Sequence, residues 1–143
     1  MTDPTPFTLA DRLAADTAPL HRDPVAELLL LDDSRWPWLV LVPHVPGARE
    51  LHDLPPVTCA RVFERVRLIG QVLQEETGCT SINVGALGNI VTQLHIHVVA
   101  RHPGDPAWPG PVWGVGTPVR RAPGERPAFT ARVVQALAAI DRH

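Results

Sequence analysis

Three polar residues alternate with branched apolar residues in the stretch NIVTQLHIHVV, residues 89–99. They are Gln93, His95 and His97. Side chains alternate between the two faces of a strand, so a strand here would place the three polar groups in a row, about 6.5–7 Å apart, on the face opposite the core. Imidazole acts as a proton carrier, a nucleophile or a metal ligand near neutral pH. The spacing therefore raises the question of which role this row performs.

Three interpretations fit two histidines spaced in this way. The first is a solvated strand face on which His95 and His97 are ordinary polar residues. The second is a zinc site in which both imidazoles bind the metal with help from His102 or Asp105; zinc needs three or four ligands, and no cysteine is close in the sequence. The third is nucleophilic catalysis, in which a neutral imidazole attacks phosphorus while a hydrogen bond to its other nitrogen fixes the tautomer.

The residues that precede the row favour nucleophilic attack on phosphorus. Asn83 lies on the preceding predicted strand, and Gly85, Gly88 and Asn89 follow it. Glycine allows backbone N–H groups to approach an anion closely. An amide side chain on the neighbouring strand can orient a phosphate or ribose oxygen. We therefore interpret this part of the chain as a site for a phosphate-bearing ligand.

Two pairs of apolar runs predict two antiparallel hairpins that would position the row. Residues 25–31 and 38–42 are separated by a polar segment whose Asp, Ser and Pro residues favour a turn. Residues 80–87 and 91–100 are separated by a Gly-Asn pair and predict the second hairpin.

One long helix is predicted over residues 53–77, with Asp53 as its N-cap. Helical spacing predicts that Phe63 faces the core and that Arg65 lies on an outer face. A short amphipathic helix is predicted at the C-terminal end, over about residues 128–141. Strands, a long helix and further strands are typical of an α+β fold with an antiparallel sheet.

The other segments are less regular. Residues 1–6 predict a loose terminus and residues 9–16 a short helix. Residues 102–127 are too rich in Pro and Gly for a long regular element, but Trp108 and Trp113 predict that this segment packs on the body of the protein.

Composition limits the class of protein. The 143 residues, of which 45% are apolar, fit one soluble domain, and a net charge of −2 argues against general nucleic-acid binding. No apolar run is long enough to span a bilayer, so no membrane partner is expected.

The predicted helix separates Cys59 from Cys79 by roughly 30 Å. With no signal-peptide pattern, we expect unpaired cysteines and a cytoplasmic location. Arg101 is expected to be solvated or paired at the surface.

The stretch GNIVTQLHIHVVAR resembles the signature of the histidine triad (HIT) superfamily, which is His-φ-His-φ-His-φ-φ preceded by Gly-Gln-x-Val-x and an upstream Asn-x-Gly. VPHV after the second apolar run, ELHDL before the long helix and INVGALGN extend the resemblance over most of the chain. The resemblance implies the HIT fold, with a five-stranded antiparallel sheet, one long helix and a short C-terminal helix, and a homodimer. We expect a single HIT-like domain over residues 1–143, with a core at about 8–101, the Pro/Gly-rich segment at 102–127 and the C-terminal helix at about 128–141.

The resemblance also implies an activity, because superfamily members are nucleotidyl hydrolases or transferases that act at the α-phosphate. His95 matches the nucleophile that takes the nucleotidyl group, and His97 matches the residue that supports the phosphate. Four further positions are expected to bind the nucleotide: Asp33, Asn83, Gly88 and Asn89. For the residue that would hold the ribose hydroxyls, Asp32 is the alternative to Asp33.

Two departures from the family pattern bear on catalysis. Gln93 stands where the first triad histidine should be, and an amide cannot become cationic or shuttle a proton. General acid–base catalysis is typically worth ~10²–10⁴ in rate, so the enzyme would be slow or would prefer leaving groups that need no protonation. We expect Gln93 to position the phosphate together with His97. Ile90 replaces the Ser or Thr that many members place near the scissile phosphate.

We therefore expect a nucleotide hydrolase or nucleotidyl transferase that acts through a nucleotidyl-histidine intermediate on His95. The alternative is a catalytically weak nucleotide-binding or sensing protein. No cofactor and no protein-bound metal are expected, although Mg²⁺ could arrive with a substrate such as a dinucleoside polyphosphate. Trp108 and Trp113 could close the pocket or pack against a dimer partner.

Overall fold

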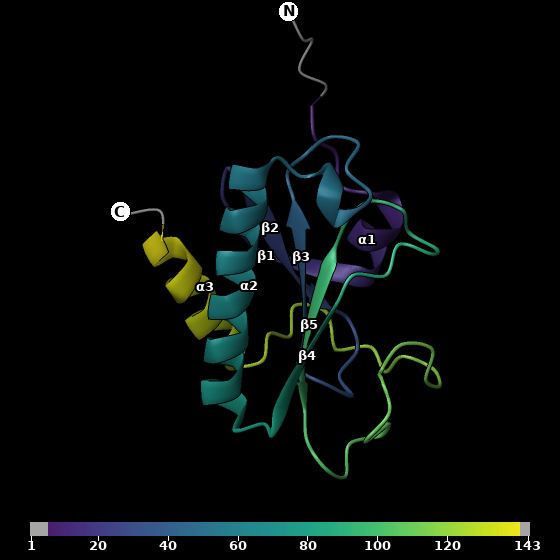
Figure 1. The fold of residues 1–143 in the computed structure, drawn as a ribbon. Helices are drawn as coiled ribbons and strands as arrows, with labels where there is room; N and C mark the ends of the chain where they lie inside the picture. The colour runs from purple at the N-terminus through teal and green to yellow at the C-terminus, as the bar shows by residue number, and fades with distance from the viewer. Residues whose placement is uncertain (1–5, 141–143) are drawn as a thin grey trace, which may run out of the picture.

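The computed structural model describes residues 6–140, and its centre is a five-stranded antiparallel sheet with the order β1-β2-β3-β5-β4. Helices α2 and α3 cover one face of this sheet, whereas α1 and the segment between β5 and α3 lie on the other face (Figure 1). The elements are α1 (Asp11–Asp16), β1 (Thr17–Arg22), β2 (Ala26–Leu31), β3 (Trp38–Pro43), a 3₁₀ turn η1 (Leu51–Asp53), α2 (Pro56–Thr77), β4 (Ser81–Gly85), β5 (Ile96–Arg101) and α3 (Phe129–Ile140). The predicted α+β class, the five strands, the long helix and the short C-terminal helix are confirmed. Residues 1–5 and residue 141 of the predicted terminal segments lie outside the described residues.

The central strands are buried on both faces of the sheet. On β3, Leu39 and Leu41 pack in the cluster beneath α2 and α3, whereas Val40 and Val42 pack in the cluster on the opposite face. A strand that is covered on both sides reads as a continuous apolar run, which is why this segment does not alternate.

The first predicted hairpin is confirmed. Strands β2 and β3 pair antiparallel, with Ala26 opposite Pro43. Strand β1 pairs with β2 at the edge of the sheet, and its sequence shows no apolar alternation because it contains Pro19 and an irregularity between Pro19 and His21. Proline is tolerated on an edge strand, where its missing N–H breaks no ladder hydrogen bond.

The second predicted hairpin is only partly correct. Strands β4 and β5 pair antiparallel, but β5 begins at Ile96, five residues later than predicted. The backbone N–H of Leu94 donates instead to the carbonyl of Ala48, in the segment that follows β3, at 3.0 Å. Gln93 and His95 therefore precede the strand, and only His97 lies on it.

Helix α2 begins later than predicted and ends as predicted. The prediction that Asp53 is the N-cap is wrong, because the helix starts at Pro56 and the cap position is Pro55. The Asp53 carboxylate accepts instead from the backbone N–H groups of Arg49 and Glu50, and it stabilises η1. At the other end, Gly78 adopts a φ of 66°, which favours glycine, and closes the helix.

The predicted inner face of α2 is wrong at two positions. Arg65, predicted to face outward, is 4% exposed, and its Nε donates to Asp23 at 2.9 Å. Phe63, predicted to face the core, is 39% exposed. A buried arginine requires a partner, and Asp23, in the turn between β1 and β2, supplies a carboxylate that helical periodicity could not reveal.

Residues 102–127 pack on the body of the protein, as predicted, and they do so on the sheet face opposite α2. Val112, Trp113 and Val115 join the apolar cluster on that face. The prediction that Arg101 is solvated or paired at the surface is wrong: its side chain is 1% exposed, and it forms hydrogen bonds with both oxygens of Asp105 at 2.7 and 3.1 Å. The buried pair ties this segment to the end of β5.

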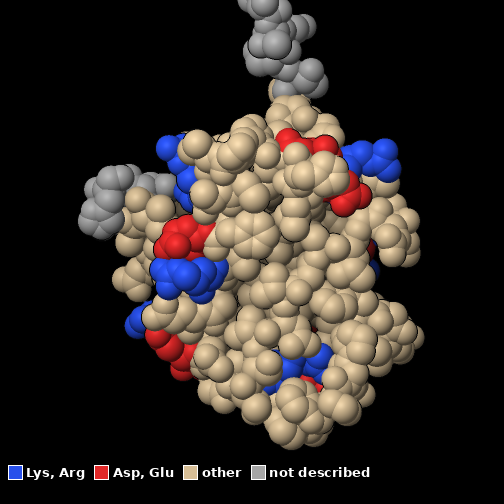
Figure 2. Space-filling view, viewed as in Figure 1, with Lys and Arg blue, Asp and Glu red and all other residues tan. Residues whose placement is uncertain are grey.

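The surface carries no large field of one sign on the face shown in Figure 2, where small groups of both signs lie within a largely uncharged surface. That face lacks the continuous basic surface that nonspecific nucleic-acid binding uses. Within residues 6–140, the structure contains no helix that is long and apolar enough to cross a membrane.

We expect Asp23→Ala to lower the free energy of unfolding by about 3 kcal/mol, because it removes the carboxylate from a buried guanidinium. The control is Glu64→Ala, which removes the partner of Arg67 in an exposed, solvent-screened pair and is expected to change stability far less. Urea unfolding of both variants measures the difference. Equal losses would show that the Asp23–Arg65 pair is no more important than a surface pair.

Candidate functional site

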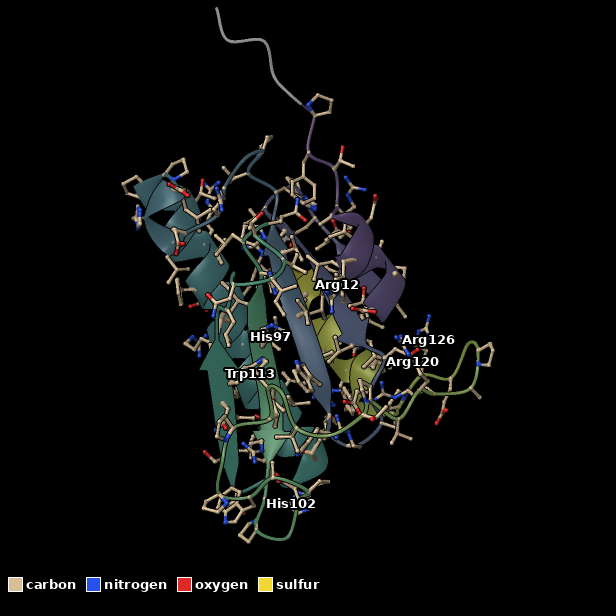
Figure 3. The ribbon with its side chains drawn as sticks, turned by 90° about the vertical axis from the view of Figure 1, so that its right-hand side faces the viewer. Arg12, His97, His102, Trp113, Arg120 and Arg126 are labelled. Carbon is tan, nitrogen blue, oxygen red and sulfur yellow. The ribbon has the colours of Figure 1, made fainter. Side chains whose placement is uncertain are left out.

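A cavity of about 520 Å³ opens on the sheet face that carries α1. Its walls come from α1, the turn after β2, residues 87–91, the two histidines of the motif and residues 112–118. Figure 3 shows His97 and Trp113 side by side next to β5, with Arg12 of α1 above them and Arg120 across from them. The cavity lies within the range of small-ligand sites, and it brings the motif to segments that are distant in the sequence.

His95 forms part of the cavity wall, and one hydrogen bond fixes its tautomer. Its ring is 5% exposed, and its Nδ1 lies 2.7 Å from the backbone carbonyl of Gln93. A carbonyl oxygen can only accept, so Nδ1 must carry the proton. In the neutral form of the ring, Nε2 is therefore the unprotonated nitrogen, which is the form that a nucleophile requires.

His97 has the opposite tautomer. The indole Nε1–H of Trp38 donates to His97 Nδ1 at 2.8 Å, and an indole can only donate. In the neutral ring the proton must therefore lie on Nε2. Burial and the neighbouring His95 lower the pKa of His97 to about 3, so the ring stays neutral at physiological pH. The two imidazoles, with ring centroids 4.9 Å apart, thus offer one acceptor nitrogen and one donor nitrogen.

Gln93 is not in the position that the expected row required. Its Oε1 accepts from the backbone N–H of Ala10 at 2.8 Å, and its Nε2 donates to the carbonyl of Thr8 at 2.8 Å. It lies in a second, smaller cavity of about 240 Å³, which it shares with His95. Both polar groups of the side chain are thus occupied by the N-terminal segment, and neither is directed at a ligand in the larger cavity.

The two aspartates of the turn after β2 both line the cavity, but they differ in burial and in hydrogen-bond partners. Asp33 lines the cavity, but it is buried and its oxygens accept from Arg35 Nη2 at 2.8 Å and Nε at 3.0 Å and from the backbone of Val119 at 3.3 Å. Burial alone would raise the pKa of Asp33, but hydrogen bonds from Arg35 and Val119 outweigh it and lower the pKa. Asp32 is half-buried; its Oδ1 accepts from the backbone N–H of Arg121 at 2.8 Å, and its Oδ2 accepts from the exposed Arg120 at 3.4 Å. Asp32 is therefore the more accessible of the two carboxylates.

The residues before the motif divide between the two cavities. Asn89 and the exposed Ile90 line the larger cavity, whereas Gly88 lines the smaller one. Asn83 lines neither: its Oδ1 accepts from Nη1 of Arg101 at 2.8 Å. The structure therefore brings Asn89 to the histidines and commits Asn83 to the buried Arg101.

Trp113 is a site residue whose place the sequence did not determine. Its ring lies 5.5 Å from that of His97 and forms the wall beside it. A Cβ at Gly85 would lie 2.9 Å from this indole, so the glycine makes room for the tryptophan. In the sequence, this contact is signalled by a glycine within a strand, Gly85, together with a tryptophan later in the chain, Trp113. Trp108 instead lies over the guanidinium of Arg101, at 5.8 Å.

The ligands that a zinc site would need are not gathered here. His102 lies away from His97, beyond the opposite end of β5 (Figure 3), and Asp105 is bound to Arg101. Among residues 6–140, no group of three or more His, Cys, Asp or Glu side chains lies close enough to hold a metal ion.

We expect His97 to make stability depend on pH. Its pKa is about 3 when folded and about 6.5 when unfolded, so the unfolded chain binds more protons between these values and stability falls as pH falls through this window. Between pH of about 7.5 and about 5, this residue should contribute a loss of about 2 kcal/mol, which His97→Gln should lack. Urea unfolding at both pH values measures the difference, and identical losses in the two proteins would contradict it.

Known proteins are similar to this chain in both sequence and fold. The family model of the HIT domain matches residues 13–104. A histidine triad protein from Sinorhizobium meliloti 1021 is 43% identical, with a TM-score of 0.86 over 91% of this chain and 96% of that chain. Another, from Marinobacter aquaeolei VT8, is 40% identical, with a TM-score of 0.88 over 94% of this chain and 98% of that chain. A search of curated proteins gave no match.

The residues matched by the family model include both histidines, the loop before them and the aspartates after β2. The match covers more than half of the chain, and the structural likeness extends over nearly all of it. The chain therefore belongs to the HIT family.

Proposed function

We propose that this protein is a nucleotide hydrolase or nucleotidyl transferase in which Nε2 of His95 attacks an α-phosphorus. HIT proteins typically bind nucleotides and act at the α-phosphate, and the site supports that chemistry for this chain. The observation that carries the proposal is the opposite hydrogen bonding of two adjacent rings: His95 keeps a free electron pair on Nε2, and His97 keeps a proton on Nε2.

The proposed reaction has two steps. In the first, a bond forms between Nε2 of His95 and phosphorus while the bond from phosphorus to the leaving group breaks, and the leaving group takes a proton from solvent. In the second, water or another hydroxyl acceptor attacks phosphorus and gives up its proton to solvent, while the N–P bond breaks and its electron pair returns to Nε2 to regenerate the neutral imidazole. The Nε2–H of His97 would donate to a non-bridging oxygen, where negative charge increases in the transition state. This donor is fixed before substrate binds, because Trp38 occupies the other ring nitrogen.

The cavity suggests how the nucleotide would lie. With the α-phosphate at the histidines, the nucleoside would extend toward α1 and the turn after β2, and Asp32 would accept from the ribose hydroxyls. Arg12 and Arg120 at the rim would favour an anionic substrate such as a dinucleoside polyphosphate, which could bring Mg²⁺ with it.

The same proposal includes a homodimer. Strand β4 is an edge of the sheet, and its Val84 is exposed, as is Phe63 on α2. Apolar side chains at an unpaired edge and on a neighbouring helix are suited to association with a second copy.

One observation favours a second candidate, a nucleotide-binding or sensing protein with little turnover. The carboxamide of Gln93 is already engaged with Thr8 and Ala10, so it gives no proton to a leaving group. In that case nucleotide would bind without forming a covalent adduct.

We expect a labelled dinucleoside polyphosphate to leave an acid-labile nucleotidyl group on His95 in rapid-quench experiments. His95→Asn should abolish the adduct and lower kcat by on the order of 10³-fold or more. The matched control is His102→Asn, a change at an exposed histidine away from the cavity, which should alter kcat by less than about threefold. Tight binding with neither adduct nor turnover in the wild type would favour the sensor.

We also expect Asp32 and Asp33 to have different roles, the first in substrate binding and the second in stability. Asp32→Asn should raise KM for ribonucleotides by about tenfold and remove the preference over 2′,3′-dideoxy substrates, because it weakens the acceptor for the ribose hydroxyls. Asp33→Asn should instead lower the free energy of unfolding by about 3 kcal/mol, because it removes a charge from the buried pair with Arg35. Steady-state kinetics and urea unfolding of both variants test this, and a KM effect confined to Asp33→Asn would reverse the assignment.

A further inference from the structure

The side chain of Gln93 contacts a part of the chain more than eighty positions away. Its carboxamide accepts from the N–H of Ala10 and donates to the carbonyl of Thr8, both at 2.8 Å, so it pairs with the backbone as a neighbouring strand would. We call this pair of hydrogen bonds the Gln93 clamp. The clamped segment leads directly into α1, which begins at Asp11.

Helix α1 needs such a tether. It has only six residues, and no side chain caps its N-terminus. A helix this short is unstable by itself in water, so external contacts must hold it. Within it, Leu13 is buried in the apolar cluster and also lines the larger cavity, together with Arg12 and Asp16. The position of α1 therefore sets one wall of the proposed nucleoside pocket.

The same residue also fixes the nucleophile. The backbone carbonyl of Gln93 accepts from Nδ1 of His95 at 2.7 Å, while its side chain holds residues 8–10. One residue thus sets the tautomer of the attacking ring and the place of the wall against which the nucleotide would bind.

We propose that Gln93 is a positioning residue that fixes α1 as the wall of the nucleotide site, and that it does not act on the leaving group. The proposal rests on the proposed function for its kinetic consequence. The clamp itself can be tested without any activity.

The chemistry of the side chain explains why glutamine is suited to this role. A carboxamide carries an acceptor and a donor on one carbon, directed side by side, which matches an N–H and a C=O two residues apart on an extended backbone. The two nitrogens of an imidazole diverge, and a neutral ring offers only one donor. A histidine at position 93 could therefore satisfy at most one of the two backbone groups.

Hydrogen exchange tests the clamp directly. Gln93→Met keeps the length of the side chain and removes both hydrogen bonds, so exchange of the Ala10 amide should accelerate by on the order of tenfold. The matched control is Gln135→Met at an exposed position on α3, which should leave that rate unchanged. Unchanged exchange at Ala10 in Gln93→Met would overturn the clamp.

Kinetics and calorimetry test the positioning role. For Gln93→Met, KM and the Kd for AMP should rise by about tenfold while kcat stays within about threefold of the wild type. Gln93→Glu keeps the acceptor for Ala10 and should recover part of the affinity. Gln93→His, which completes the triad pattern, should behave like Gln93→Met and should not raise kcat.

The outcomes separate this inference from the proposed function. A fall in kcat that grows with the basicity of the leaving group, at constant KM, would show that Gln93 acts on the leaving group and would overturn the inference. A rise in kcat in Gln93→His would overturn it as well. If the wild type neither turns over nor binds AMP, the proposed function fails and the positioning role fails with it, whereas the exchange rate of Ala10 still decides whether the clamp exists.

Discussion

The burial of two imidazoles side by side is the constraint on which the site depends. At 5% and 7% exposure, neither His95 nor His97 can rely on water, so the hydrogen bond at each Nδ1 decides where the proton lies. A carbonyl faces one ring and an indole N–H faces the other, and this makes the two Nε2 atoms chemically opposite. Neither a solvated strand face nor a pair of metal ligands would need this complementarity. It suits a reaction in which one nitrogen attacks a phosphoryl group and the other donates to its oxygen.

The same physical demand, that buried polar groups find partners, explains where this protein departs from the expectations of its family. Asn83 is bound to the buried Arg101, Asp33 is bound to Arg35, and Gln93 is bound to the backbone at Thr8 and Ala10. Each of these side chains was expected to contact a nucleotide, and each has a hydrogen-bond partner within the protein. A motif match therefore identifies a residue by its position in the sequence. The hydrogen-bond partners of that residue in the folded protein determine what its side chain can bind.

The sequence predicted what depends on local pattern and missed what depends on distant partners. Apolar runs placed β2, β3 and α2 because burial of such runs needs no particular partner. The sequence pattern places Arg65 on the wrong side of α2, because the deciding contact is with Asp23, forty-two positions away. The start of β5 was missed for a similar reason, since Leu94 bonds to Ala48 and not to β4. In the site, the spacing of His95 and His97 predicted that they lie together, but their tautomers depend on Trp38 and on the loop geometry at Gln93.

The walls of the cavity are held by fewer contacts than the sheet that supports them. The sheet is stabilised by apolar clusters on both faces, whereas α1 and residues 112–121 are short or irregular. A few of their side chains, such as Leu13 and Val112, pack in the cluster, and hydrogen bonds from a few other side chains to distant backbone groups complete their attachment. Arg35 donates to the carbonyl of Val115, Arg121 donates to that of Leu31, and Gln93 holds residues 8–10.

Hydrogen bonds of this kind contribute about 1 kcal/mol each, which is small beside the stability of a domain but large for a segment that depends on one or two of them. Substitutions in these side chains should therefore move a wall of the site before they unfold the sheet.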